Sequence, residues 1–206
     1  MALISIITGD IVKSRSVKDS DLWMTLLKKA LKRYGLDTSK WNIYRGDSFQ
    51  LELSDITESF LVALYIKASI KTIKGLDVRL AVGIGEKTFS GQTVVESNGE
   101  AFQYSGETLE TLKNEKVNLK IKTSQEDLDR ELNLYFKFAL SIMDHWTVND
   151  AEIVKLAIEY PEALQQELGK KIGINQNAVS TRLKRAQIDL LMQLDQMFRQ
   201  KVKQLT

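Results

Sequence analysis

The segment Trp41-Asn-Ile-Tyr-Arg-Gly-Asp-Ser-Phe-Gln-Leu-Glu-Leu53 decides the fold, because it predicts two short strands joined at Gly46-Asp47. Glycine adopts the positive φ that a tight hairpin turn requires, and the residues on both sides are typical of strands. We therefore expect a β-hairpin with Asp47 at its tip. The apolar strand positions are Tyr44, Phe49, Leu51 and Leu53.

A second carboxylate ends another predicted strand. The run Leu3-Ile-Ser-Ile-Ile-Thr8 indicates a buried central strand, and Gly9-Asp10 follows it directly. If this strand and the hairpin are neighbours in one sheet, Asp10 and Asp47 face each other. Two carboxylates there suit divalent metal ions that bridge phosphates, because such ions prefer oxygen ligands. The alternative is structural, with Asp10 capping local amides and Asp47 only forming the turn.

The composition is that of an ordinary soluble globular protein. The 206 residues, 43% apolar and 27% charged with a net charge of +2, suffice for one large domain or two small ones. The chain has no cysteine and one histidine, which excludes disulfides, thiolate metal sites and a histidine-rich zinc site. We expect no haem, flavin or zinc. Since no apolar run reaches the roughly 18 residues of a membrane helix, we expect a cytoplasmic protein without a membrane partner.

The first half predicts the order β-α-β-β-α-β, followed by a further helix and strand. The first six elements match a ferredoxin-like arrangement, an antiparallel sheet with helices packed on one face. The expected strands are residues 3–8, the two arms of the 41–53 hairpin, 78–85 and 117–122, and the expected helices are residues 20–34, 55–72 and 100–112.

After residue 123 the strand signals disappear. A long helix over about residues 124–146 is expected to connect the first domain, residues 1–123, to an all-α domain, residues 147–206. That second domain predicts a helix over 148–158, another opened by Pro161, and a third from Gln176 that continues toward Lys203. Proline suits a first helical position because the amide it lacks is unpaired there.

Four blocks of the first half carry a family resemblance. They resemble, in order, the conserved blocks of class III nucleotidyl cyclases, and the N-terminal half as a whole resembles the bacterial SatD family. The resemblance implies a nucleotidyl cyclase-like sheet domain in which Asp10 and Asp47 bind Mg²⁺ or Mn²⁺. The blocks are Ile4 to Arg15, Arg45 to Phe49, Val78 to Gly85 and Gly99 to Leu109.

The fourth block departs from the cyclase pattern. Gln103 and Glu107 stand where cyclases have an asparagine for the ribose and an arginine for the transferred phosphate. An acid in place of that arginine repels a triphosphate and removes transition-state stabilisation, so the sequence argues against cyclisation. The candidate nucleotide or phosphate contacts are then Lys13, Arg15 and Arg45, with Lys87 as a further cation.

The segment Glu162 to Ala186 resembles the DNA-reading helix-turn-helix of sigma factors and related regulators, within about residues 147–187. Its apolar residues Leu164, Leu168, Ile172, Ile174, Val179 and Leu183 are expected to pack the two helices and the turn. Between Leu168 and Ile188 there are five cations and no acid. We expect base contacts from Gln176, Asn177, Ser180 and Thr181, and phosphate contacts from Lys170, Lys171, Arg182, Lys184 and Arg185. The alternative is a protein-interaction or dimer module.

An apolar stripe follows the helix-turn-helix and requires burial. It either folds back on the connector helix or pairs with a second subunit, and we expect a homodimer. The stripe consists of Ile188, Leu191, Leu194, Phe198, Val202 and Leu205.

The sequence therefore favours a DNA-binding transcriptional regulator whose cyclase-like domain senses a nucleotide or another phosphorylated ligand. The alternative is a metal-dependent nucleotidyl cyclase or nucleotidyltransferase that its helix-turn-helix localises. A third interpretation is a scaffold in which both sites are degenerate.

Overall fold

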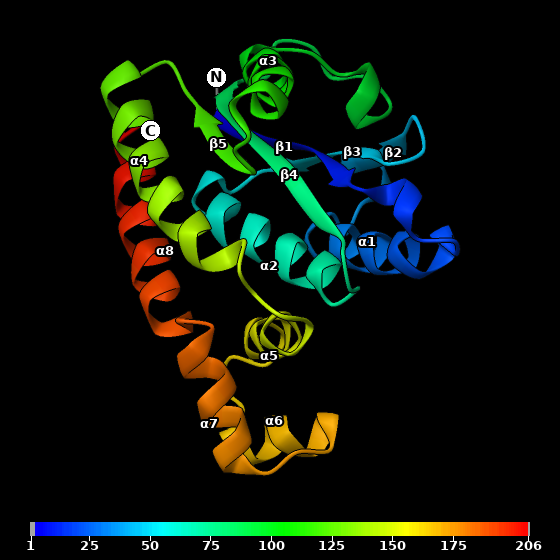
Figure 1. Ribbon diagram of the computed structural model, residues 1–206. Coiled ribbons are helices and arrows are strands. Elements are labelled where there is room, and N and C mark those ends of the chain that lie inside the picture. Colours follow the sequence, from blue (N-terminus) through cyan, green and yellow to red (C-terminus); the bar gives the residue numbers. More distant parts are fainter. Residues whose placement is uncertain (1–2, 206) are drawn as a thin grey trace.

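The computed structural model describes residues 3–205, which form one five-stranded sheet and eight α-helices (Figure 1). The mixed α+β class is thus confirmed. The strands are β1 (Leu3–Val12), β2 (Trp41–Tyr44), β3 (Ser48–Leu53), β4 (Asp77–Glu86) and β5 (Leu119–Lys122). The helices are α1 (Ser20–Tyr34), α2 (Ser59–Lys71), α3 (Glu100–Glu115), α4 (Glu126–Met143), α5 (Val148–Glu159), α6 (Gln165–Ile172), α7 (Gln176–Arg185) and α8 (Ile188–Val202).

The sheet has the strand order β2-β3-β1-β4-β5, and all its pairs are antiparallel except β4 with β5. The predicted hairpin is present as β2 and β3, because Arg45 and Gly46 adopt positive φ angles of 51° and 87° in the turn. β1 lies at the centre of the sheet, as its apolar sequence indicated.

The outer edge of β5 is paired with a side chain. Asn133 of α4 accepts a hydrogen bond from the Ile121 amide at 2.8 Å and donates one to the Ile121 carbonyl at 2.9 Å. The Asn133 amide thus supplies both hydrogen bonds that a neighbouring strand would make with Ile121.

Helices cover both faces of the sheet (Figure 1). α1 and α2 lie on one face, while α3 packs on the other, where Ile4 and Ile6 contact Ala101 and Phe102. α3 follows the first six elements, to which the expectation of helices on one face applied, and it gives the sheet a second covered face. Gly83 of β4 makes this packing possible, since a Cβ there would collide with the Ala101 carbonyl.

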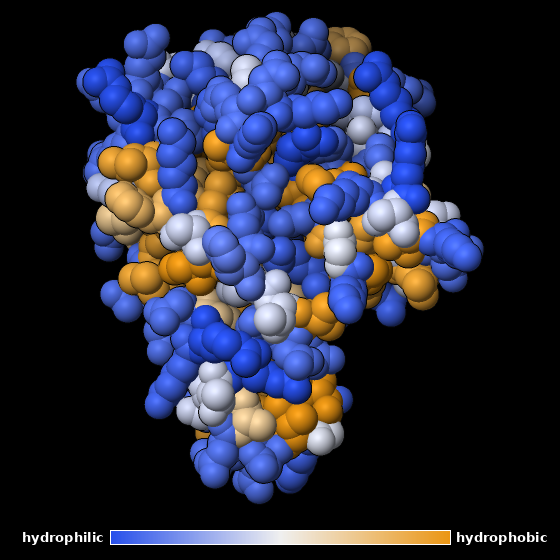
Figure 2. Space-filling view, viewed as in Figure 1, coloured by the Kyte–Doolittle hydropathy of each residue, from blue (hydrophilic) through white to orange (hydrophobic). Residues whose placement is uncertain are grey.

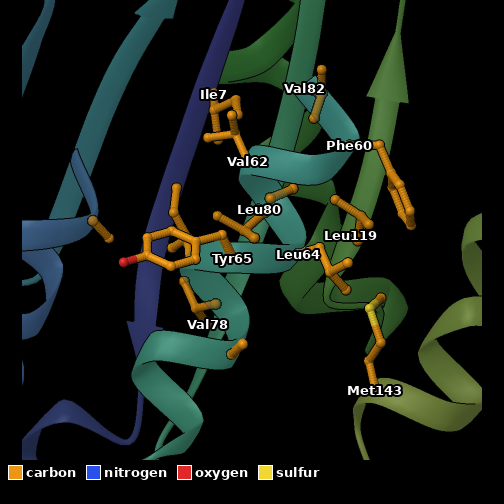
Figure 3. Close-up of a cluster of buried hydrophobic side chains, with 14 of the residues drawn as sticks. Ile7, Phe60, Val62, Leu64, Tyr65, Val78, Leu80, Val82, Leu119 and Met143 are labelled. Atoms are coloured by element: carbon orange, nitrogen blue, oxygen red, sulfur yellow. The ribbon is translucent and has the colours of Figure 1, made fainter. Parts of the chain in front are cut away.

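α2 is buried on all sides, which explains why its sequence lacks a polar face. Figure 3 shows apolar side chains of α2, β1, β4 and β5 in one cluster, with Met143 of α4 beside them. Phe60 of α2 stacks on Phe136 of α4 at 5.2 Å between ring centroids, and Phe198 of α8 lies 6.0 Å from both rings. The apolar stripe of α8 is thus largely folded back on α2 and α4. The division into two domains stays a prediction.

Three boundaries in the helical half differ from the sequence expectations. α4 ends at Met143, three residues before Trp146. Pro161 lies in a turn and α6 begins only at Gln165, because the Glu167 carboxylate accepts from the Leu164 amide and caps the helix there. α7 and α8 are separate helices because Gln187 adopts a left-handed φ of 55°. Within residues 3–205, no helix has the length and apolar character needed to cross a membrane.

Candidate functional site

The backbone places Asp10 and Asp47 at the same end of neighbouring strands. Asp10 of β1 pairs with Ser48 of β3, and the Ile11 amide donates to the Asp47 carbonyl at 3.1 Å. The two acids, 37 positions apart in the sequence, thus come from adjacent backbone segments.

Arg79 of β4 engages the Asp10 carboxylate. Its Nε donates to Oδ1 at 2.9 Å and its Nη2 donates to Oδ2 at 2.5 Å, and both side chains are largely buried. This two-bond geometry is the strongest form of an arginine–carboxylate contact. Sequence reasoning missed Arg79, although a cation inside an otherwise apolar strand was a signal that it needed a partner.

Asp47 has a different partner. Its Oδ2 accepts a hydrogen bond from Ser14 Oγ at 2.5 Å, which ties the hairpin tip to the 3₁₀ turn Ser14–Ser16 that follows β1. Of the predicted phosphate-binding cations, Arg15 lies in this turn and Arg45 lies in the hairpin turn, and both are exposed.

A polar row crosses four strands next to these acids. The strand register aligns Tyr44, Ser48, Asp10 and Arg79 on β2, β3, β1 and β4. Burial raises the pKa of Tyr44, and the negative charges of Asp10 and Glu110 raise it further against the opposing effect of Arg45. The Tyr44 hydroxyl therefore stays protonated and remains a hydrogen-bond donor at neutral pH.

The candidate metal ligands are committed to other contacts. Among residues 3–205 there is no group of three or more acidic or histidine side chains that could hold a metal ion. Both Asp10 oxygens accept a hydrogen bond from Arg79, so a divalent ion at Asp10 would share this carboxylate with the guanidinium cation. Binding of Mg²⁺ or Mn²⁺ by Asp10 and Asp47 stays a prediction.

Gln103, Glu107 and Lys87 form no hydrogen bond with the Asp10 carboxylate within residues 3–205. Gln103 and Glu107 are exposed on α3, and Glu107 lines a separate groove with Lys120 and Lys122. Lys87 donates to the buried Glu52 at 2.7 Å.

Glu52 of β3 is a buried acid with two cationic partners. Lys40 donates to its Oε1 at 2.6 Å and Lys87 donates to its Oε2 at 2.7 Å. Burial raises the pKa of this carboxyl, but the two lysine hydrogen bonds outweigh burial and hold the pKa below its ordinary value. Glu52 therefore stabilises the fold as a carboxylate.

The helices α5, α6 and α7 form a unit around a small core of their own, centred on Ile153, Leu168 and Val179. Residues 173–175 connect α6 to α7, with Gly173 at a positive φ of 72°. Asn175 caps α7 by accepting from the Ala178 amide at 2.9 Å. Of the predicted packing residues, Leu164 is not part of this core, since it is 69% exposed.

Most of the predicted DNA-contacting residues are exposed on α6 and α7. Ser180 and Arg182 are half-buried, and the others are exposed. Lys171 Nζ lies 3.8 Å from the centre of the Tyr160 ring. The exposed set is Lys170, Lys171, Gln176, Asn177, Thr181, Lys184 and Arg185.

Two of the five cations form ion pairs with α5. Arg182 contacts Glu152 at 3.0 Å, and Arg185 contacts Asp150 at 2.6 Å. The segment itself contains five cations and no acid, as counted from the sequence, but acids about 30 residues earlier in the chain neutralise two of them. Lys170, Lys171 and Lys184 are the cations of this segment that have no acidic partner within residues 3–205.

The structure thus defines a mixed α+β protein with two notable features. Polar side chains are aligned across four strands of the sheet, and the unit of α5, α6 and α7 carries exposed polar and basic residues. The chain belongs to the SatD family, whose model matches residues 3–202. The match extends well beyond the N-terminal half, so the sheet and the three-helix unit are both parts of the family's architecture. Searches of the curated proteins and of the solved structures found no match to the chain.

Proposed function

We propose that this SatD-family protein is a DNA-binding regulator in which the α5–α7 unit binds duplex DNA and the sheet senses a nucleotide or another phosphorylated ligand. The observation that supports DNA binding most directly is the pair α6 and α7, which are joined by a three-residue turn. Exposed polar side chains lie at the start of α7. In a helix-turn-helix, the start of the second helix reads base edges in the major groove.

The proposed roles follow from exposure and pairing. Gln176, Asn177 and Thr181 are exposed on α7 and are assigned to base edges, with the half-buried Ser180 beside them. Lys170 and Lys184 are unpaired and are assigned to DNA phosphates together with Lys171. Arg182 and Arg185 first hold α7 against α5, and any phosphate contact competes with Glu152 and Asp150.

For the sheet half, we propose a ferredoxin-like, cyclase-related arrangement. The order of the first six elements and the strand order β2-β3-β1-β4 support it. Arg79 is then the cation that a phosphorylated ligand meets in place of the arginine absent at Glu107. Arg45 shares the hairpin turn with Asp47, and Arg15 follows Ser14, which is hydrogen-bonded to Asp47. A divalent ion bound by Asp10 and Asp47 would neutralise part of the phosphate charge.

We also propose that the protein is a homodimer paired through α4 and α8. An apolar groove of about 390 Å³ lies between these helices, and Phe138 at its border is 64% exposed. Figure 2 shows hydrophobic surface over α4 and α8, on the left of the view. Since α8 follows α7 directly, a two-fold pairing there sets the spacing of the two α7 helices.

Gel-shift experiments with mixed-sequence duplex DNA test the proposed function. We expect binding at low salt that weakens steeply as salt increases, because phosphate contacts release counterions. Lys170→Ala with Lys184→Ala should weaken it, whereas Lys28→Ala with Lys32→Ala, which removes the same charge from the exposed side of α1, should not. No binding to any duplex at low salt would overturn the proposal.

An enzymatic function is the second candidate, and the adjacency of Asp10 and Asp47 favours it. Incubation with the four common nucleoside triphosphates and Mg²⁺ should then yield a product. Asp10→Asn should abolish that turnover without changing DNA binding, since Asp10 is not part of the α5–α7 unit.

A further inference from the structure

A second cavity lies where the sheet meets the helical unit. It has a volume of about 600 Å³, which is within the usual range for small-molecule sites. None of Asp10, Asp47 and Arg79 lines it. Its lining residues come from the end of β1, the α2–β4 turn, the residue before β5 and the start of α5, and they include Lys13, Lys71, Lys74, Asp77, Asn118 and Asn149.

The charges behind the cavity wall balance one another. Lys67 and Lys71 of α2 are both buried, and both form ion pairs with Asp77, at 2.7 and 3.1 Å. Lys67 also contacts Asp144 at 2.6 Å, and Lys71 donates to the Asp144 carbonyl at 3.0 Å. Two lysines therefore face two aspartates, and this buried cluster has no net charge.

Lys13 and Lys74 are not part of that balance. Both line the cavity and are exposed, and neither forms an ion pair within residues 3–205. They add two uncompensated positive charges to a concave surface. A dianion is the ligand that matches this charge, and Asn118 and Asn149 add amide groups suited to oxygen ligands.

The backbone holds Lys13 in an unusual conformation. Its φ of 62° and ψ of 27° lie in the left-handed region, which costs a residue with a side chain on the order of 1 kcal/mol. Such strain is concentrated at binding sites. Here it positions a lysine at the end of the central strand, facing the turn that contains Lys74.

We propose that this cavity binds a small anion with a dianionic phosphate group, held between Lys13 and Lys74. Because its walls belong both to the sheet and to the start of α5, a ligand here contacts the DNA-binding half and the sheet at once. Binding itself does not depend on the function proposed above. Any effect of the ligand on DNA affinity would rest on that proposed function.

Calorimetric titration of the full chain with inorganic phosphate, and separately with ribose 5-phosphate, tests the site. Wild type should bind at least one of these probes, and the comparison tells free phosphate from a phosphate ester. Lys13→Gln with Lys74→Gln should bind it about tenfold more weakly or worse, because two charge-assisted contacts are lost. The matched control, Lys28→Gln with Lys32→Gln, removes the same charge from α1 and should bind as wild type does.

Asp10→Asn tests whether phosphate binds at this cavity or at the polar row that contains Asp10. If the cavity is the site, this variant should bind phosphate as wild type does. The inference is overturned if neither probe binds wild type, or if the Lys13/Lys74 variant binds as tightly as wild type. It is also overturned if only Asp10→Asn loses binding, a result that would instead support the ligand site at the strand end. Absence of DNA binding would refute the proposed regulator and leave these titrations interpretable.

Discussion

Arg79 donates two hydrogen bonds to Asp10 across the β1–β4 pair, and these two residues are direct partners in the strand register. The same carboxylate is the one that the cyclase resemblance assigns to a metal ion. Arg79 and a divalent cation therefore compete for Asp10, and removal of one should favour the other.

Arg79→Gln should increase affinity for Mn²⁺, because it frees both oxygens of Asp10 from a cation. We expect an increase of about tenfold, measured by electron paramagnetic resonance of free Mn²⁺. Arg130→Gln is the control, since Arg130 also pairs with an aspartate, Asp127, but at an exposed position on α4. Equal Mn²⁺ affinity of wild type and Arg79→Gln would exclude this competition.

Arg185→Ala should destabilise the protein, because it leaves the Asp150 carboxylate buried without its cation. We expect a loss of about 2–3 kcal/mol in the free energy of unfolding, measured with urea. Lys184→Ala, one position earlier and exposed without a partner, should change stability by less than about 0.5 kcal/mol. Similar losses in both variants would show that the Arg185–Asp150 pair has no special role.

Stability should fall on acidification in a way that depends on Glu52. The pKa of Glu52 is lower in the folded protein than its ordinary 4.5, so ionised Glu52 makes its full contribution to the free energy of unfolding above pH 4.5. That contribution is lost as the pH falls through the folded-state pKa. Glu52→Gln should cost about 2 kcal/mol at pH 7 and weaken the acid dependence. Urea unfolding at pH 7 and pH 3.5 measures both effects. The exposed Glu162→Gln is the control, and an unchanged acid dependence in Glu52→Gln would contradict the assignment.

Phe138→Glu should convert the proposed dimer to a monomer, because it places a charge on the apolar surface between α4 and α8. Light scattering coupled to size exclusion reports the mass directly. Phe89→Glu is the matched control, since Phe89 is 60% exposed on the loop before α3. A wild-type mass of one chain at all accessible concentrations would rule out the pairing.

Local patterns in the sequence predicted most elements of this fold. The Gly46-Asp47 turn, the apolar first strand and the three-residue turn before Gln176 each depend on neighbouring residues, so their sequence suffices. The exceptions are also informative. Pro161 suits the start of a helix, yet the Glu167 cap moves that start to Gln165.

Contacts between distant elements were harder to predict. Arg79 meets Asp10 only because β1 and β4 adopt one particular register, and nothing in the local sequence of either strand fixes that register. The neutralisation of Arg182 and Arg185 likewise depends on the packing of α5 against α7. Charge counted along a segment therefore overestimates the charge that the folded surface presents.

The pairing of Asn133 with both backbone groups of Ile121 has a consequence for self-association. An unprotected outer strand is a template on which other chains extend a sheet, the route to aggregates and fibrils. Here a single carboxamide blocks that template on β5. This contact therefore opposes edge-to-edge association of copies of the protein through β5. Asn133→Leu should make concentrated solutions become turbid at a lower temperature than wild type.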